Sequence, residues 1–339
     1  MTSWDDLNAR ARGLATHLLG RAALESLAQA EDLPTLAAEL ARRGYPIEEG
    51  AQQRGTGIEL AARREGARRL ATLRRWAGRR EPSLAIVFED EERRSISSLI
   101  RGAAQHAPPE ARLSGLLPTP ALPERALEEL SRQPAPGAVA SLLSAWRHPL
   151  ANALLPEAAR PEPDLLRLDV SLNRAFAERA FKSARQRGAR GMLARHVQRL
   201  LDIENSFTTL VLSEEKDSRM AEYWVPGGRD LTEALAERAV ASGSPLAAGR
   251  IVAAAFAGTP LASAFAEPGS HPEGIEGAVL GGVIAELRTA ARTDPLSPAF
   301  LLGYTLRLRA ELLDIRRAVW GISLGAPAAI RMGGLVTAS

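Results

Sequence analysis

Five histidines are the side chains of this sequence with the broadest chemical use, and they are scattered: His17, His106, His148, His196 and His271. No two of them stand at a metal-ligand spacing such as His-Glu-x-x-His. The sequence has no cysteine, which excludes disulfides, thiolate metal sites and a thiol nucleophile. We therefore expect no catalytic residue, no metal site and no cofactor site.

Nucleotide chemistry is not indicated either. No phosphate loop of the glycine-lysine-serine kind is present, and the Gly-Thr-Gly at 55–57 is half of a dinucleotide fingerprint without its strand. Two pairs of adjacent glutamates, Glu91-Glu92 and Glu214-Glu215, would point in different directions on a helix. We interpret those pairs as solvated side chains rather than carboxylates that share a proton.

Asp202 and Asn205 form an acid–amide pair that would share a helix face, because they stand three residues apart. A catalytic or metal-binding role is conceivable. Such a pair on a packed helix more often satisfies neighbouring backbone or side-chain groups. We adopt this structural interpretation.

The elements around that pair recur three times along the chain. Residues 200–228 read as the end of a long helix, a short helix and a Pro-Gly-Gly stop. Residues 88–118 and 311–336 repeat this plan, at a period of about 110 residues, far longer than a solenoid unit. We predict three helical domains, at residues 1–117, 118–225 and 226–339.

Identities at a constant offset support the repeat. Six residues of the first copy, Leu24, Glu25, Leu27, Ala37, Leu40 and Pro46, match Leu127, Glu128, Leu130, Ala140, Leu143 and Pro149. The breaks Tyr45-Pro46-Ile47, His148-Pro149-Leu150 and Thr259-Pro260-Leu261 mark the same place in each copy.

Helical periodicity predicts an all-α fold. Asp32, Asp164, Ser244 and Ser297 are expected helix N-caps, the last two being followed by proline. A long helix is expected from Asp164 to about Arg187, interrupted by Gly188 and Gly191. No stretch combines strict alternation with β-branched enrichment and turn residues, so no strand is predicted.

The helix from Ile58 to about Gly78 is the most basic of the chain. Its apolar side carries Leu70, Leu73 and Trp76. The simpler interpretation is a solvated face, and the alternative is contact with an acidic partner or anionic lipid. The arginines expected to spread over one broad face are Arg63, Arg64, Arg68, Arg69, Arg74, Arg75, Arg79 and Arg80.

Composition is that of a globular protein, with 45% hydrophobic and 24% charged residues. A formal net charge of +3 is too small to indicate nucleic acid by itself. No apolar run approaches the ~20 residues that cross a bilayer, and the acidic start is unlike a secretory signal. We expect a cytoplasmic protein, soluble or peripheral to a membrane.

The whole chain resembles the C-type stalk subunits of V-type and A-type ATPases and ATP synthases, whose vacuolar homologue is the d-type subunit. The most specific motif is the Asp-x-x-Asn helix, Asp202 to Asn205, that leads to Gly227-Gly228. The last copy also fits, with Asp294-Pro295-Leu296 before its final helix. That helix carries Glu311, Arg316, Gly321, Gly325 and Pro327.

The first copy departs from the family pattern. It keeps Leu99-Ile100-Arg101, but Glu92 and Ser95 replace the acid and the asparagine, and Gly20 replaces a capping serine. These departures concern the polar contacts of that copy rather than its fold.

The resemblance implies a funnel of three similar domains around a pseudo-threefold axis. It implies a non-catalytic socket that holds the central shaft on the membrane proteolipid ring of a proton- or sodium-translocating enzyme. Its location would be the cytoplasmic face of the membrane, with one copy per complex and a monomer in isolation. No cofactor and no nucleic acid would be bound.

Two other hypotheses are weighed against this one. A basic helical-repeat module that binds nucleic acid or an anionic membrane is suggested by the arginine helix, but aromatic residues are only 4%. An α-helical enzyme is disfavoured because no catalytic constellation is present. The salt dependence of binding distinguishes the stalk subunit from the basic module. Nucleic-acid binding weakens steeply as salt rises, whereas a docked interface with an apolar core weakens less.

Overall fold

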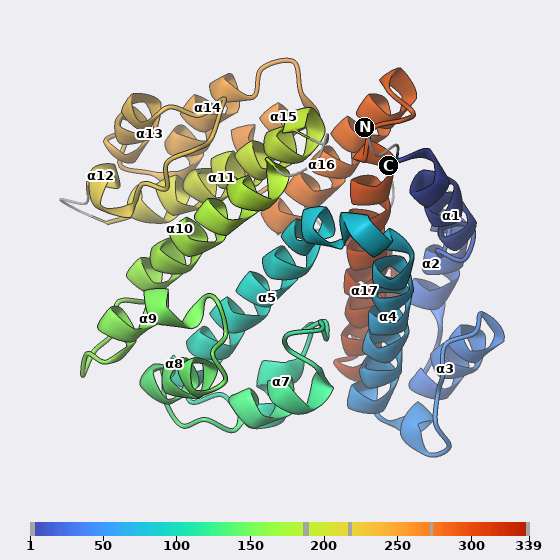
Figure 1. The fold of residues 1–339 in the computed structure, drawn as a ribbon. Helices are drawn as coiled ribbons and strands as arrows, with labels where there is room; N and C mark the ends of the chain where they lie inside the picture. Colours follow the sequence, from blue (N-terminus) through green and yellow to red (C-terminus); the bar gives the residue numbers. More distant parts are fainter. Residues whose placement is uncertain (1–3, 186–189, 216–218, 272–273, 337–339) are drawn as a thin grey trace. The chain divides into compact units, whose positions relative to one another are not determined.

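All regular structure in the computed structural model, which describes residues 4–185, 190–215, 219–271 and 274–336, is helical (Figure 1). The predicted all-α class is confirmed. Six of the described helices have twenty residues or more: α4 (Gly55–Ala77), α5 (Glu81–Ala104), α10 (Leu165–Ala184), α11 (Arg190–Leu212), α16 (Gly274–Thr293) and α17 (Ala299–Ser323).

Short helices separate the long ones in a recurring order. After α5 come α6 (Pro109–Leu113), α7 (Glu124–Ser131), α8 (Pro136–Ala145) and α9 (Ala151–Ala158). After α11 come α12 (Met220–Tyr223), α13 (Glu233–Val240), α14 (Pro245–Ala255) and α15 (Pro260–Ala266). The chain starts with α1 (Asp5–Ala15), α2 (Arg21–Gln29) and α3 (Leu33–Arg42), and α18 (Ala328–Gly333) follows α17. None of the described helices is long and apolar enough to span a membrane.

Three of the four predicted helix caps are confirmed. The Asp32 carboxylate accepts a hydrogen bond from the Thr35 amide, and Asp164 accepts from two amides of the first turn of α10. Ser244 caps α14. The prediction for α17 is one residue off, because Pro298 itself occupies the N-cap position there. Residues 186–189, which include Gly188, lie outside the described residues, and Gly191 lies inside α11.

The chain divides into two compact units. Unit 1 contains residues 78–258, and unit 2 contains residues 3–77 together with 259–339. Unit 2 therefore joins the beginning of the chain to its end. The division into three domains at 117/118 and 225/226 stays a prediction, and each unit is described by itself below.

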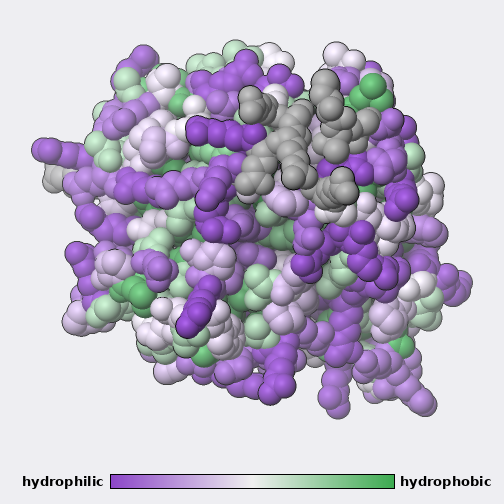
Figure 2. Space-filling view, viewed as in Figure 1, coloured by the Kyte–Doolittle hydropathy of each residue, from purple (hydrophilic) through white to green (hydrophobic). Residues whose placement is uncertain are grey.

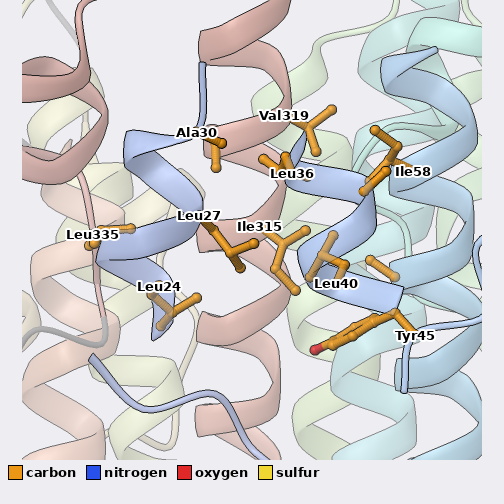
Figure 3. Close-up of a cluster of buried hydrophobic side chains, with 13 residues drawn as sticks. Leu24, Leu27, Ala30, Leu36, Leu40, Tyr45, Ile58, Ile315, Val319 and Leu335 are labelled. Atoms are coloured by element: carbon orange, nitrogen blue, oxygen red, sulfur yellow. The ribbon is translucent and has the colours of Figure 1, made fainter. Parts of the chain in front are cut away.

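The core of unit 2 packs N-terminal helices against a C-terminal one (Figure 3). Leucines of α2 and α3 lie against Ile315 and Val319 of α17 and against Ile58 of α4. Apolar residues recur every three or four positions on all these helices, so each presents one apolar stripe to the others. The leucines are Leu24, Leu27, Leu36 and Leu40, all nearly inaccessible to solvent.

In unit 1, α10 packs along α5 and also contacts α9 and α11. Helix α11 packs in turn on α13 and α14. A smaller apolar cluster joins the end of α11 to the helices that follow it, through Leu212, Met220, Leu231, Ala236 and Val240.

Candidate functional site

The acid–amide pair of α11 fixes the segment that leaves the short helix α12. The Asp202 carboxylate accepts hydrogen bonds from the amides of Arg229, Asp230 and Leu231, at 2.9, 3.1 and 3.3 Å. Asn205 donates to the carbonyl of Val225 at 2.8 Å and accepts from its amide at 3.0 Å. This is the structural role predicted for the pair.

Two glycines let that segment approach the helix. At Gly228 a Cβ atom would lie 2.2 Å from the Asp202 carboxylate, a distance that no side chain tolerates. Gly227 has a φ of +111°, a conformation that favours glycine. The Gly-Gly that ends the sequence motif therefore lets the backbone come close enough to α11 for the next three amides to donate to Asp202.

Helix α17 carries an equivalent pair, Glu311 and Asp314, also three residues apart and buried. The Asp314 carboxylate accepts from the amide of Val336 at 2.8 Å, just after α18. The Glu311 carboxylate accepts from the amide of Leu19, which leads into α2. A polar pair on a long helix again holds the backbone that follows a short helix.

Helix α5 has a weaker version of this contact. Glu92 is 4% exposed, and its carboxylate accepts from the Thr119 hydroxyl at 2.9 Å. The His148 imidazole Nε2 lies 3.5 Å from the other carboxylate oxygen. We call these three arrangements, at Asp202/Asn205, Glu311/Asp314 and Glu92, the polar clamps.

The prediction that the adjacent glutamates are solvated is wrong for Glu92. Sequence spacing indicates that Glu91 and Glu92 point in different directions but not which direction is covered. The loop at Thr119 and the residue His148 cover Glu92, whereas Glu91 is half-buried. Glu214 and Glu215 are exposed, as predicted.

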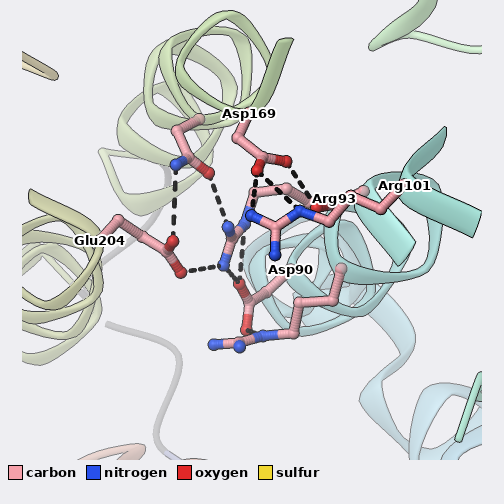
Figure 4. Close-up of polar contacts among 8 residues, drawn as sticks. Asp90, Arg93, Arg101, Asp169 and Glu204 are labelled. Atoms are coloured by element: carbon pink, nitrogen blue, oxygen red, sulfur yellow. Dashed lines mark hydrogen bonds and ion pairs between the residues drawn. The ribbon is translucent and has the colours of Figure 1, made fainter. Parts of the chain in front are cut away.

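A buried arginine joins three long helices of unit 1 (Figure 4). Arg93 of α5 donates to Asp90 at 2.7 Å, to Asn173 of α10 at 2.6 Å and to Glu204 of α11 at 2.8 Å. Its guanidinium also lies over the ring of Phe176, 5.4 Å from the centroid. No motif singled out this group, in which the partners on α10 and α11 stand 80 and 111 residues from Arg93 in the sequence.

A second buried arginine organises unit 2. Arg69 of α4 donates to Glu65 at 2.7 Å and to Glu311 at 2.8 Å, and Tyr45 donates to the same Glu311 oxygen at 2.6 Å. Burial raises the pKa of the Glu311 carboxyl, although Tyr45 and Arg69 donate to it. The prediction that the arginines of this helix spread over one solvent-exposed face is therefore wrong for Arg69. It is also wrong for Arg63, which is 8% exposed.

The histidines are not brought together. His148 and His196 are buried, His17 and His106 are exposed, and His271 is half-buried. Within the described residues, no three histidine or carboxylate side chains gather into a metal-binding group. Burial lowers the pKa of His196 to about 4, although Asp90 opposes this effect and Arg94 adds to it.

His196 should make stability depend on pH between 6.5 and about 4. In this range the unfolded chain binds a proton on this histidine and the native protein does not, so stability falls as pH falls. The loss, complete near pH 4, is about 3 kcal/mol for a shift of this size. Urea unfolding of the protein and of His196→Gln at pH 7 and pH 4.5 checks this. Equal pH slopes for both proteins would contradict it.

Removing the Asp202 carboxylate should destabilise the protein without affecting a chemical step. Asp202→Ala leaves three backbone amides without an acceptor, which costs about 1–3 kcal/mol. Asn205→Ala should cost a similar amount. Thermal unfolding measures both, with the exposed Glu214→Ala as a control that stays within about 0.5 kcal/mol. An unchanged melting temperature for Asp202→Ala would refute the clamp.

One loop of unit 2 exposes large apolar side chains. This segment, residues 323–330, comprises the last residue of α17, the connecting residues 324–327 and the first three residues of α18, and it contains no charged residue. For brevity it is called the loop 323–330. Within this loop Leu324 is 82% exposed and Ile330 is 67% exposed. Surfaces that expose several large apolar side chains are often protein contacts.

Comparison with known protein families identifies one family. The family model described as "ATP synthase (C/AC39) subunit" matches residues 7–332, nearly the whole chain. No curated protein matches the chain.

Proposed function

Because the chain belongs to the ATP synthase (C/AC39) subunit family, we propose that it is a non-catalytic rotor subunit of a V/A-type ATPase or ATP synthase. In this proposal it sits on the cytoplasmic face of the membrane. There it couples the central shaft to the proteolipid ring that moves protons or sodium ions. The observation that carries the proposal is the family match over residues 7–332.

The polar clamps supply a mechanical reason for this role. A part that transmits torque must resist displacement of its helices, which dense packing provides. In each clamp a buried side chain of a long helix holds the backbone or side chain of the following segment, at Arg229, Val336 or Thr119. We propose that these clamps recur in three similar domains that close into a funnel around a pseudo-threefold axis.

The loop 323–330 is our candidate for the ring-facing contact. Charge is depleted at the cores of protein interfaces, and this loop is uncharged and exposes Leu324 and Ile330. A stable attachment needs on the order of 1,000 Å² of buried surface, so the loop would be the centre of a larger contact.

Deleting the protein should leave a soluble head that hydrolyses ATP but no longer drives ions across the membrane. A tagged chain should recover the ring and the shaft subunits from detergent-solubilised membranes. Ion pumping that survives the deletion, or ATP hydrolysis by the purified chain alone, would refute the proposal.

The apolar loop gives a sharper test of the ring contact. Leu324→Asp/Ile330→Asp should abolish recovery of the ring while recovery of the shaft persists. A matched control is Val211→Asp/Leu246→Asp, since these residues are also exposed, at 49% and 47%, but lie in unit 1. Equal recovery of the ring by both double variants would remove the loop from the contact.

A further inference from the structure

Helix α4 carries acidic side chains only on its buried side, so the charges on its solvent-facing side are all basic. Both acidic residues of the helix, Glu59 and Glu65, are buried at 5% and 4% exposure. Glu59 accepts from the Trp320 indole, and Glu65 accepts from Arg68 and Arg69. Every charged residue on the accessible side of α4 is consequently an arginine.

Three of these arginines form a row along one face of α4, with two small alanine side chains between them. Arg64, Arg68 and Arg75 follow one another at spacings of four and seven residues, which places them along one face over about 16 Å. Ala67 and Ala71 lie between them on the same side and are accessible to solvent. We call these five residues the arginine ladder. In Figure 2 hydrophilic side chains cover the part of the view where α4 lies.

Two of the ladder's arginines are positioned by carboxylates of unit 2. Glu65 binds Arg68 through both of its carboxylate oxygens at 2.7 Å, although the Arg68 side chain is 68% exposed. Glu48, in the loop before α4, pairs with Arg64 at 2.5 Å. The Glu48 side chain is 71% exposed, and a pair this open to water contributes little, so an incoming carboxylate can replace it.

We propose that the arginine ladder binds an acidic helix of another protein chain, one that carries carboxylates at i, i+4 spacing. Such carboxylates stand about 6 Å apart, as Arg64 and Arg68 do, so the two rows can pair. The small side chains of Ala67 and Ala71 let a second helix approach α4 closely, which larger side chains at these positions would prevent.

Two other anionic partners fit the ladder less well. Bases of nucleic acid stack on open aromatic rings, and the ladder contains none. The aromatic residue of α4, Trp76, belongs to the apolar side of the helix and has Arg10 of α1 over its ring, 5.7 Å from the centroid. A helix that lies on a bilayer buries large apolar side chains beside its basic residues. The ladder offers only alanine methyl groups in that place.

A photo-crosslinking residue at Ala71 in the full-length protein, inside the cells that produce it, tests the inference. The expected product joins Ala71 to a helical segment with carboxylates four residues apart. The control position is Ala38 of α3, which is exposed and lies outside the ladder. Crosslinks to lipid or nucleic acid, or to a segment without that acidic spacing, would overturn the proposal.

Charge removal provides the second measurement. Arg68→Gln/Arg75→Gln should lower the Ala71 crosslink about tenfold, the effect of losing about 1.4 kcal/mol of binding. Glu65 keeps Arg69 as a partner in that variant, and both substituted side chains are exposed, so the fold is retained. Arg42→Gln/Arg125→Gln changes net charge equally at other accessible sites and should have no effect. Equal yields from both double variants would also overturn the proposal.

The inference rests on the proposed function only in that the partner is expected to be a subunit of the same rotor complex. The two can fail separately. A crosslink from Ala71 to an acidic helix of a protein outside a rotary ATPase would refute the proposed function but support the proposal that the arginine ladder binds an acidic helix. Recovery of the ring and the shaft subunits without a crosslink from Ala71 would support the proposed function but refute the binding of an acidic helix to the arginine ladder.

Discussion

Arg93→Met is expected to destabilise the protein by about 3–5 kcal/mol, because it removes the buried cation that Asp90 and the largely buried Glu204 share. Arg93 is 4% exposed and pairs with Asp90 at 2.7 Å and with Glu204 at 2.8 Å. Arg94 still donates to Asp90 in the variant, so the uncompensated charge is mainly that of Glu204. Urea unfolding followed by circular dichroism measures the change.

Two further variants separate the loss of the ion pair from a loss of packing. Arg93→Met/Glu204→Met removes both partners and should recover much of the stability, since a buried pair replaced by apolar side chains is often neutral. Arg101→Met breaks an ion pair with Asp169 in which the arginine is 56% exposed, and should cost less than about 1 kcal/mol. A double variant less stable than Arg93→Met would show that the packing around the guanidinium, not its charge, stabilises this site.

The helical class and the first residues of several helices could be predicted from the sequence, because periodicity and caps are local properties. Asp32 and Asp164 cap the helices they were expected to cap. The role of Asp202 and Asn205 was also predictable, since two polar residues on the apolar side of a helix need partners in the interior. Their partners, the amides of Val225 and of residues 229–231, lie only 20 to 29 residues away.

The buried arginines could not be predicted in the same way. A periodic pattern treats arginine as a surface residue, and Arg69 falls within the run of arginines that was expected to form a single exposed face. Its burial depends on Glu311, 242 residues further along the chain. Likewise, the packing of α2 and α3 against α17 reflects apolar stripes that many helices share, so sequence alone does not choose the partner.

Glu311→Ala is expected to destabilise unit 2 by about 3–5 kcal/mol and to loosen the N-terminal helices from α17. Three groups lose their common acceptor in this variant: the Arg69 guanidinium, the Tyr45 hydroxyl and the Leu19 amide. Glu311 is 1% exposed, so water does not replace the lost carboxylate without opening the core. Unfolding in urea gives the magnitude, and protease cleavage near residues 16–20 reports the loosening.

The location of the cleavage distinguishes this prediction from a general loss of stability. Leu19 precedes α2, whose leucines pack on Ile315 and Val319 of α17, so release of the Leu19 amide frees the entry to that core. The control Glu25→Ala breaks an exposed pair with Arg21 and should change stability by no more than about 0.5 kcal/mol. Glu311→Gln can still accept hydrogen bonds and should protect residues 16–20 better than alanine does. Protection of that segment in Glu311→Ala equal to the wild type would mean that the apolar core alone holds the two chain ends together.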